Sequence, residues 1–184
     1  MAIRPATRRD IPEIMALEAR YYVGNLASTE HSGGFISILH SETWFRSVVD
    51  GGGLHVAVNE QGSVCGFFAV ASPPDQSDPD ISPIMKSMLE LAAEVKFADQ
   101  VIAQQSYAFR GPVLIDRAAR GRGLYSEFNT VMRQAYRDRY ALGVLFVAAD
   151  NPRSLHTVTS KLGAEPLALF EIDSKQYHFL AFRF

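Results

Sequence analysis

The stretch covering residues 111–125 constrains this chain most, because it combines a strand, a glycine turn and a helix start in immediate succession. The apolar run at residues 113–115 predicts a buried strand, and a helical pattern begins at residue 124. The turn between them contains Arg120-Gly-Arg-Gly123. The first N–H groups of a helix lack intrahelical partners and carry the positive end of its dipole. Glycines let a phosphate approach such a backbone, so the stretch predicts a phosphate site with both arginines as further donors.

Three familiar phosphate-binding or nucleic-acid-binding classes fit this turn poorly. A Walker A loop is excluded because no Lys-Ser or Lys-Thr follows Gly123. A dinucleotide fingerprint would need a third glycine where Ser126 stands. A formal net charge of −2 and a single Arg-Gly turn argue against a nucleic-acid-binding segment.

The turn resembles motif A of the GCN5-related N-acetyltransferase (GNAT) family, which reads Arg/Gln-x-x-Gly-x-Gly/Ala after a strand. Here the motif stands as Arg120-Gly-Arg-Gly123-Leu-Tyr125, so a tyrosine replaces the small last residue. In that family the turn holds the pyrophosphate of coenzyme A. The resemblance therefore implies acetyl-CoA as co-substrate.

A second stretch resembles motif B of the same family, where an asparagine contacts the pantetheine arm. It contains Asn151, Ser154 and Gly163, with one residue more between the last two than the family's usual spacing. The resemblance also implies that strands four and five part, so that pantetheine pairs with the backbone of strand four. The cofactor-binding residues expected on these grounds are Val113, Leu114, Ile115, Arg120, Gly121, Arg122, Gly123, Leu124, Tyr125, Asn151 and Ser154.

The order of the expected elements also resembles the family. Strands are expected at 2–5, 54–58, 64–71, 107–115 (interrupted at Gly111-Pro112), 143–149, 167–172 and 176–184, and helices at 11–22, 44–49, 124–140 and 152–162. Asp10 and Glu13 are expected to form a capping box at the first helix. The fold class implied is GNAT-like α/β: a mixed, mostly antiparallel sheet of about seven strands, splayed between strands four and five, with helices on both faces.

An insertion of about residues 73–105 departs from the family pattern. The turn residues Pro73–Asp80 open it, and apolar residues at alternating steps of four and three then predict one long helix over 83–104. This helix is expected either to close one flank of the core or to serve as a lid or dimer face. A homodimer is therefore left open.

The bulk properties fit one domain over residues 1–184. The longest apolar run, residues 142–149, is too short to span a bilayer, and the N-terminal residues have no apolar signal core. We therefore expect a cytoplasmic protein without nucleic-acid or membrane partners. The single Cys65 lies in a strand pattern and is expected to be a small buried apolar residue. No Cys/His cluster has metal-ligand spacing, so no metal is expected.

The chemistry of acetyl transfer needs few side chains. Backbone N–H groups near Val113 and Leu114 could stabilise the developing oxyanion. A tyrosine on the motif B helix protonates the leaving thiolate in many family members, but the corresponding places here hold Val158 or Thr159. Residues that could replace it are Tyr107, Tyr125 and Tyr177, and residues considered as general base are Glu18, Glu30, His31, His55 and His156. None is singled out, so the catalytic residues are left unknown.

The sequence is compatible with two functions. The first is an acyl-CoA-dependent N-acyltransferase, with acetyl as the expected group, acting on a small-molecule or peptide amine. The second is a non-catalytic acyl-CoA-binding sensor or interaction module, which the missing tyrosine would suit.

Overall fold

The computed structural model describes residues 1–77 and 81–184. The last three residues of the expected turn Pro73–Asp80 thus lie outside the described residues. The chain divides into two compact units. The first unit contains Met1–Ala71 and Gly111–Met132, and the second contains Ser72–Arg110 and Arg133–Phe184. The single domain expected from chain length stays a prediction.

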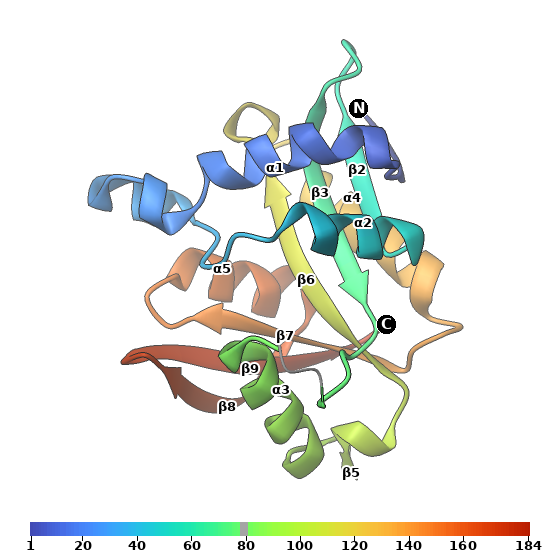
Figure 1. Cartoon of the computed structure of the whole chain (residues 1–184), viewed down its shortest axis with the longest axis vertical. Helices are drawn as coiled ribbons and strands as arrows, with labels where there is room; N and C mark the ends of the chain where they lie inside the picture. Colours follow the sequence, from blue (N-terminus) through green and yellow to red (C-terminus); the bar gives the residue numbers. More distant parts are fainter. Residues whose placement is uncertain (78–80) are drawn as a thin grey trace. The chain divides into compact units, whose positions relative to one another are not determined.

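The first unit is a sheet with helices on both of its faces. Its elements are β1 (Ala2–Pro5), α1 (Ile11–Arg20), α2 (Glu42–Asp50), β2 (Leu54–Val58), β3 (Val64–Ala71), the second half of β6 (Tyr107–Ile115) and most of α4 (Leu124–Tyr136). The pairs β1–β2 and β2–β3 are antiparallel. Figure 1 shows α1 and α2 in front of β2 and β3, with α4 behind them. The bounds of β2 and β3 confirm the two strands expected from sequence.

Alternation along β3 explains how both faces are covered. Successive strand side chains point to opposite faces of a sheet. The ring of Phe67 meets Phe45 of α2 at a centroid distance of 6.0 Å, and the next ring, Phe68, meets Phe128 of α4 at 5.3 Å. All four rings are fully buried. Burying a phenylalanine side chain stabilises a fold by about 1.5–3 kcal/mol, so these rings fix the helices to the sheet.

The second unit pairs the first half of β6 with the C-terminal strands. Its other elements are α3 (Pro83–Glu94), β4 (Lys96–Phe97), β5 (Gln100–Val101), β7 (Leu142–Ala148), α5 (Pro152–Thr157), β8 (Glu165–Ile172) and β9 (Lys175–Arg183). The pair β6–β7 is parallel, whereas β7–β9 and β8–β9 are antiparallel. The strand order is β1-β2-β3-β6-β7-β9-β8. This mixed, mostly antiparallel seven-stranded sheet confirms the expected fold class; the splay between β6 and β7 stays a prediction.

The helix expected over residues 83–104 is wrong in its second half. Helix α3 ends at Glu94, and a short hairpin, β4–β5, follows it. Ala98 and Asp99 turn this hairpin with φ of 52° and 67°. The buried Phe97 and Ile102 belong to the same apolar cluster as Met88 of α3, so apolar spacing alone did not mark the helix end. Among residues 1–77 and 81–184, no helix is both long and apolar enough to cross a membrane.

Two smaller expectations also fail. The carboxylate of Asp10 does not cap α1; it accepts hydrogen bonds from the backbone N–H and the hydroxyl of Thr7 at 2.7 and 2.9 Å. Glu13 instead accepts from the backbone N–H of Val64 at 2.8 Å. A three-residue 3-10 turn, Arg8–Asp10, precedes the helix. Strand β6 runs through Gly111 and Pro112 without the expected interruption.

We predict that Asp10 makes folding stability dependent on acidic pH. Hydrogen bonds from Arg4, at 2.7 and 2.8 Å, lower the pKa of Asp10 to about 2 from 3.8, against the opposing effect of burial. A lowered pKa stabilises the fold above the unfolded value, and this stabilisation is lost as pH falls from about 4 to about 2. Asp10→Asn should therefore lower the free energy of unfolding at pH 7 by about 2 kcal/mol. Urea unfolding at several pH values would show the difference shrinking in acid; a difference independent of pH would contradict the prediction.

Candidate functional site

The turn between β6 and α4 has the backbone of an anion site. Gly121 and Gly123 have φ of 76° and 82°, and a Cβ on either would meet nothing within 4 Å. Their requirement is therefore conformational, since L-residues other than glycine are strained at such φ. The carbonyl oxygen of Gly123 accepts from Ser126 and Glu127 at 2.9 and 3.1 Å, which starts the helix. The outer side of the turn is left open to a ligand.

The N–H groups of this turn are available for such a ligand. Within the described part of the chain, the backbone N–H groups of Arg122, Gly123 and Leu124 have no protein acceptor. They lie at the N-terminus of a 13-residue helix, where its dipole favours negative charge. The arrangement can therefore hold a phosphate or pyrophosphate group by backbone hydrogen bonds.

Arg120 connects this turn to the segment between α1 and α2. Its Nε donates to the carbonyl oxygen of Ile115 at 2.9 Å, and Nη1 donates to that of Gly33 at 2.7 Å. The guanidinium also lies over the Tyr21 ring, 5.1 Å from its centroid. Although the side chain was expected to bind phosphate, these contacts give it a bracing role. Its part in cofactor binding stays a prediction.

Neighbouring residues reinforce the same connection. The backbone N–H of Arg117 donates to the hydroxyl of Tyr21 at 2.8 Å, and its guanidinium pairs with Glu30 at 3.1 Å. Asp116 caps the turn through the N–H of Ala118 and pairs with Arg20 of α1 at 2.6 Å. The turn between β6 and α4 is thus fixed to α1 and to the segment that follows it.

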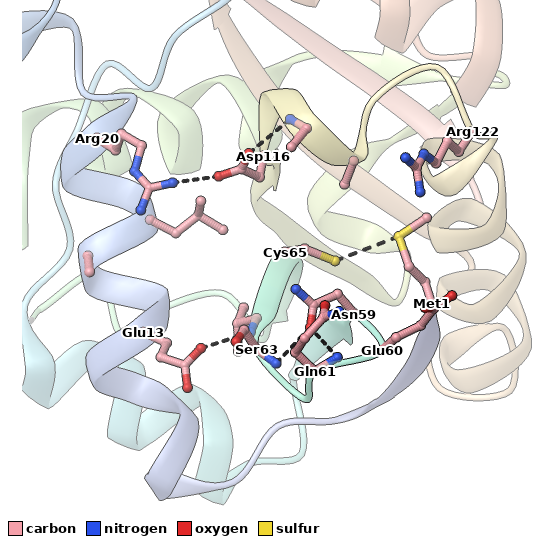
Figure 2. A pocket seen from close by; sticks show the side chains of 15 residues that line it. Met1, Glu13, Arg20, Asn59, Glu60, Gln61, Ser63, Cys65, Asp116 and Arg122 are labelled. Carbon is pink, nitrogen blue, oxygen red and sulfur yellow. Dashed lines mark hydrogen bonds and ion pairs between the residues drawn. The ribbon is translucent and has the colours of Figure 1, made fainter.

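A cavity of about 610 Å³ lies on one flank of the turn. Figure 2 shows Arg122 across this cavity from Glu13, with Cys65 between them. The Cys65 thiol is buried, which raises its pKa, and it donates to the carbonyl oxygen of Ala57 at 3.4 Å. The expectation that Cys65 is a small buried residue is thereby confirmed. Of the expected cofactor-binding side chains, only Arg122 lines this cavity.

The strand that leads into the turn holds the expected oxyanion donors. Leu114 is buried, whereas Val113 and Ile115 are half-buried. The strand ends against β3, where the N–H of Asp116 donates to the carbonyl oxygen of Cys65 at 2.9 Å. Helix α4 begins at Leu124, whose side chain is buried, and continues with Tyr125, whose side chain is half-buried. All nine expected residues from 113 to 125 therefore belong to one continuous structure of the first unit.

Asn151 and Ser154 belong to the second unit, and their part in cofactor binding stays a prediction. The side chain of Asn151 is buried, and its Oδ1 accepts from the N–H of Ser154 at 3.2 Å, which caps α5. A π-helical turn, Val158–Leu162, follows α5. A π turn accommodates one additional residue, which explains the longer spacing before Gly163.

The places expected for a tyrosine acid lie where the helix changes to this π turn. Val158 is buried. Thr159 is half-buried, and its hydroxyl donates to the carbonyl oxygens of Leu155 and His156 at 2.9 and 3.1 Å. The Thr159 hydroxyl proton is therefore already committed to the helix backbone.

The three tyrosines considered as substitutes differ in environment. Burial raises the pKa of Tyr107 and of Tyr177. The ring of Tyr177 stacks on Phe170 and meets Phe146 edge-on. Tyr125 lies at the start of α4 in the first unit. The first two belong to the apolar core of the second unit, and an acid role for any of the three stays a prediction.

Four of the base candidates lie in different environments. His55 is buried and stacks on Phe68 at 4.8 Å, and this burial lowers its pKa. His156 is exposed on α5. Glu30 pairs with Arg117, and the Nε2 atom of His31 is buried without a partner among the described residues.

The fifth candidate, Glu18, forms a pair that the sequence did not indicate. Its carboxylate is 1% exposed and contacts His40, which was not considered as a base. The distance between Glu18 Oε1 and His40 Nδ1 is 2.7 Å, and Glu18 Oε2 accepts from the His40 backbone N–H at 2.9 Å. Twenty-two positions separate the two residues, and no spacing rule connects a helix residue with a loop residue at that distance. Only the fold brings them together.

No group of three His, Cys, Asp or Glu side chains that could hold a metal ion occurs among residues 1–77 and 81–184. The expectation that no metal takes part stays a prediction.

Neither a family model nor a curated protein sequence matches this chain. Solved structures do match it over its whole length. An acetyltransferase of the GNAT family from Streptococcus agalactiae has a TM-score of 0.68 at 17% identity, covering 100% of this chain and 95% of the other. The NatC complex bound to Gag peptide and CoA has a TM-score of 0.65 at 10% identity, covering 100% and 98%.

A third similar structure also contains the co-substrate. It is a GNAT superfamily phosphinothricin acetyltransferase from Sinorhizobium meliloti in complex with AcCoA, with a TM-score of 0.64 at 13% identity, covering 99% of this chain and 87% of the other. These identities establish a common architecture rather than a common activity. The chain has the fold of the GNAT acetyltransferases.

Proposed function

We propose that the protein is an acyl-CoA-dependent N-acetyltransferase that transfers the acetyl group of acetyl-CoA to a primary amine. The observation that carries the proposal is the turn before α4, where the backbone N–H groups of residues 122–124 have no acceptor within the described part of the chain. Two structures of the same fold contain CoA or AcCoA. In this proposal the N–H groups of Arg122, Gly123 and Leu124 bind the pyrophosphate.

The chemistry asked of the protein is chiefly positioning. An amine attacks a thioester readily once the two groups are held about 3 Å apart, and good orientation replaces much of the entropy cost of their encounter. The backbone N–H groups near Val113 and Leu114 would stabilise the negative charge that develops on the carbonyl oxygen. The bracing by Arg120 would keep strand and turn in one fixed relation, since it joins Ile115 to the turn directly.

The amine acceptor is proposed to meet the segment between α1 and α2. One complex of the same fold is bound to a peptide, which makes a peptide amine one member of the class to test. Thiol release from acetyl-CoA, measured with small amines, peptides with free N-termini and lysine peptides, tests the function. Binding of acetyl-CoA without release for any amine would favour the non-catalytic module, which the Thr159 hydroxyl, already bonded to backbone, also suits.

We predict that Gly121→Glu and Gly123→Glu each abolish CoA binding. The new carboxylate would repel the pyrophosphate, and its Cβ would occupy the approach to the N–H groups. The left-handed backbone adds a strain of about 1–2 kcal/mol. Gly52→Glu is the matched control, because Gly52 also has positive φ (68°) with open space around it, but lies in the turn between α2 and β2. Calorimetry with CoA should show loss of binding in the first two variants only; equal affinity in all three would refute the site.

We predict that Thr159→Ala lowers kcat less than tenfold, or by less than about 1.4 kcal/mol of barrier. The hydroxyl donates to helix carbonyls, and a thiolate leaves readily without an acid, since its conjugate acid has a pKa near that of a free cysteine, about 8.5. Ser160→Ala is the control, because its hydroxyl makes a similar bond to the carbonyl oxygen of His156 at 2.6 Å. A hundredfold loss confined to Thr159→Ala, with CoA affinity preserved, would assign a chemical role to this residue.

A further inference from the structure

We propose that His40 is the general base that takes the proton from the acceptor amine, and that Glu18 positions it. This inference rests on the proposed acetyltransferase function. It assigns a role to a residue that no sequence motif marked, and it follows from the geometry of one buried pair.

Both hydrogen-bond contacts of the Glu18 carboxylate are with His40. Both of its oxygens contact this one residue, Oε1 at the ring Nδ1 and Oε2 at the backbone N–H. The carboxyl group is 1% exposed, although it lies on α1 amid the apolar cluster of the first unit. Burying a carboxylate costs free energy unless it is hydrogen-bonded. The two contacts with His40 offset this cost, and they position the imidazole.

The hydrogen bond to Glu18 sets the state of the imidazole. A carboxylate oxygen accepts hydrogen bonds, so this contact assigns the N–H to Nδ1 and leaves Nε2 as the ring nitrogen that can accept a proton. No described residue forms a hydrogen bond with Nε2, and the side chain is 20% exposed. A histidine whose Nδ1 is hydrogen-bonded to a carboxylate and whose Nε2 has no such partner matches the arrangement in which a carboxylate orients a catalytic histidine.

The ring is also held in place from its side. It packs against the indole of Trp44 at a centroid distance of 4.0 Å and against the buried ring of Phe45 at 5.9 Å. Backbone hydrogen bonds join Ile36 to Tyr21 and to Val23, which anchors the segment leading to His40. The imidazole therefore has little freedom to leave its position.

Trp44 relates this base to the strand proposed to stabilise the oxyanion. A Cβ built on Gly111 of β6 would lie 3.5 Å from Cη2 of Trp44. One indole ring thus separates the imidazole from the β6 backbone, two residues before Val113. In this proposal the acceptor nitrogen meets Nε2 either directly or through one water molecule.

In the proposed step the acceptor nitrogen loses two protons. Nε2 of His40 removes one proton from the ammonium of the acceptor, and the imidazolium that forms faces the carboxylate of Glu18. The free amine attacks the thioester carbonyl carbon; the C–N bond forms and the C–S bond breaks, with the electron pair leaving on sulfur. The thiolate accepts the second proton from nitrogen, and His40 returns its proton to solvent. The products are an amide, CoA thiol and one released proton.

The first test replaces the base. His40→Ala should lower kcat by about 10²–10⁴-fold, the usual contribution of general base catalysis, and leave acetyl-CoA affinity unchanged. Added imidazole should restore part of the activity, because it can enter the space left by the side chain. His156→Ala, which removes an exposed histidine of α5, is the control and should behave as wild type with and without imidazole.

The second test asks whether Glu18 acts through His40. Glu18→Gln retains the volume of the buried side chain and should lower kcat by about tenfold or more. The double variant should be no slower than His40→Ala alone, since residues that act as one unit are strongly non-additive. A purely structural role for Glu18 would instead give additive losses. If His40→Ala unfolds, His40→Gln provides the same comparison.

The outcomes separate this inference from the proposed function. A wild-type protein that binds acetyl-CoA but releases no thiol with any amine overturns both. An active wild type with His40→Ala or His40→Gln within threefold of it overturns only the role of His40. Loss of activity without rescue by imidazole, together with additive loss in the double variant, also overturns it. Rescue together with non-additivity supports it.

Discussion

One arginine side chain joins three segments of the first unit. Arg120 donates to the carbonyl oxygens of Ile115 and Gly33, so strand β6, the turn before α4 and the segment after α1 are joined at one guanidinium. Arginine suits this task because its planar donors are fixed in geometry and remain charged. Hydrogen bonds to a charged donor contribute about 1.5–3 kcal/mol each, more than neutral ones. The residue that sequence reasoning assigned to phosphate therefore has an additional structural role.

The strands were predictable where an apolar run is bounded by turn residues on both sides. Strands β2 and β3 end where turn residues end their apolar runs, and their bounds agree with those expected from sequence. The insertion was not predictable past Glu94, because Ala98 and Asp99 adopt positive φ without being glycine. A single aspartate next to an alanine is a weaker turn signal than glycine or proline. The apolar spacing of a helix was in this case produced by a helix followed by a hairpin.

The sequence indicated the glycine turn of the candidate site, but it did not indicate which side chains form pairs near it. Gly121 and Gly123 mark the turn because only glycine adopts its φ without strain. The extra residue before Gly163 was visible in the sequence, but only the structure shows that a π-helical turn absorbs it. The pair of Glu18 and His40 joins a helix to a loop, and periodicity does not relate positions in different elements. Pairs of this kind arise from tertiary packing alone.

The two proton transfers of the proposed reaction place unequal demands on the protein. A thiolate leaves readily, which makes an acid near Thr159 dispensable. The incoming amine is different, because a lysine-like amine has an ordinary pKa of about 10.4, and roughly one molecule in a few thousand is unprotonated at pH 7. A peptide N-terminus, at about 7.7–8.0, is unprotonated in roughly one molecule in ten. Deprotonation by His40 thus matters far more for the first class than for the second. The loss of kcat in His40→Ala should therefore be larger with lysine-like amines than with peptide N-termini, because a larger share of the former must lose a proton before attack.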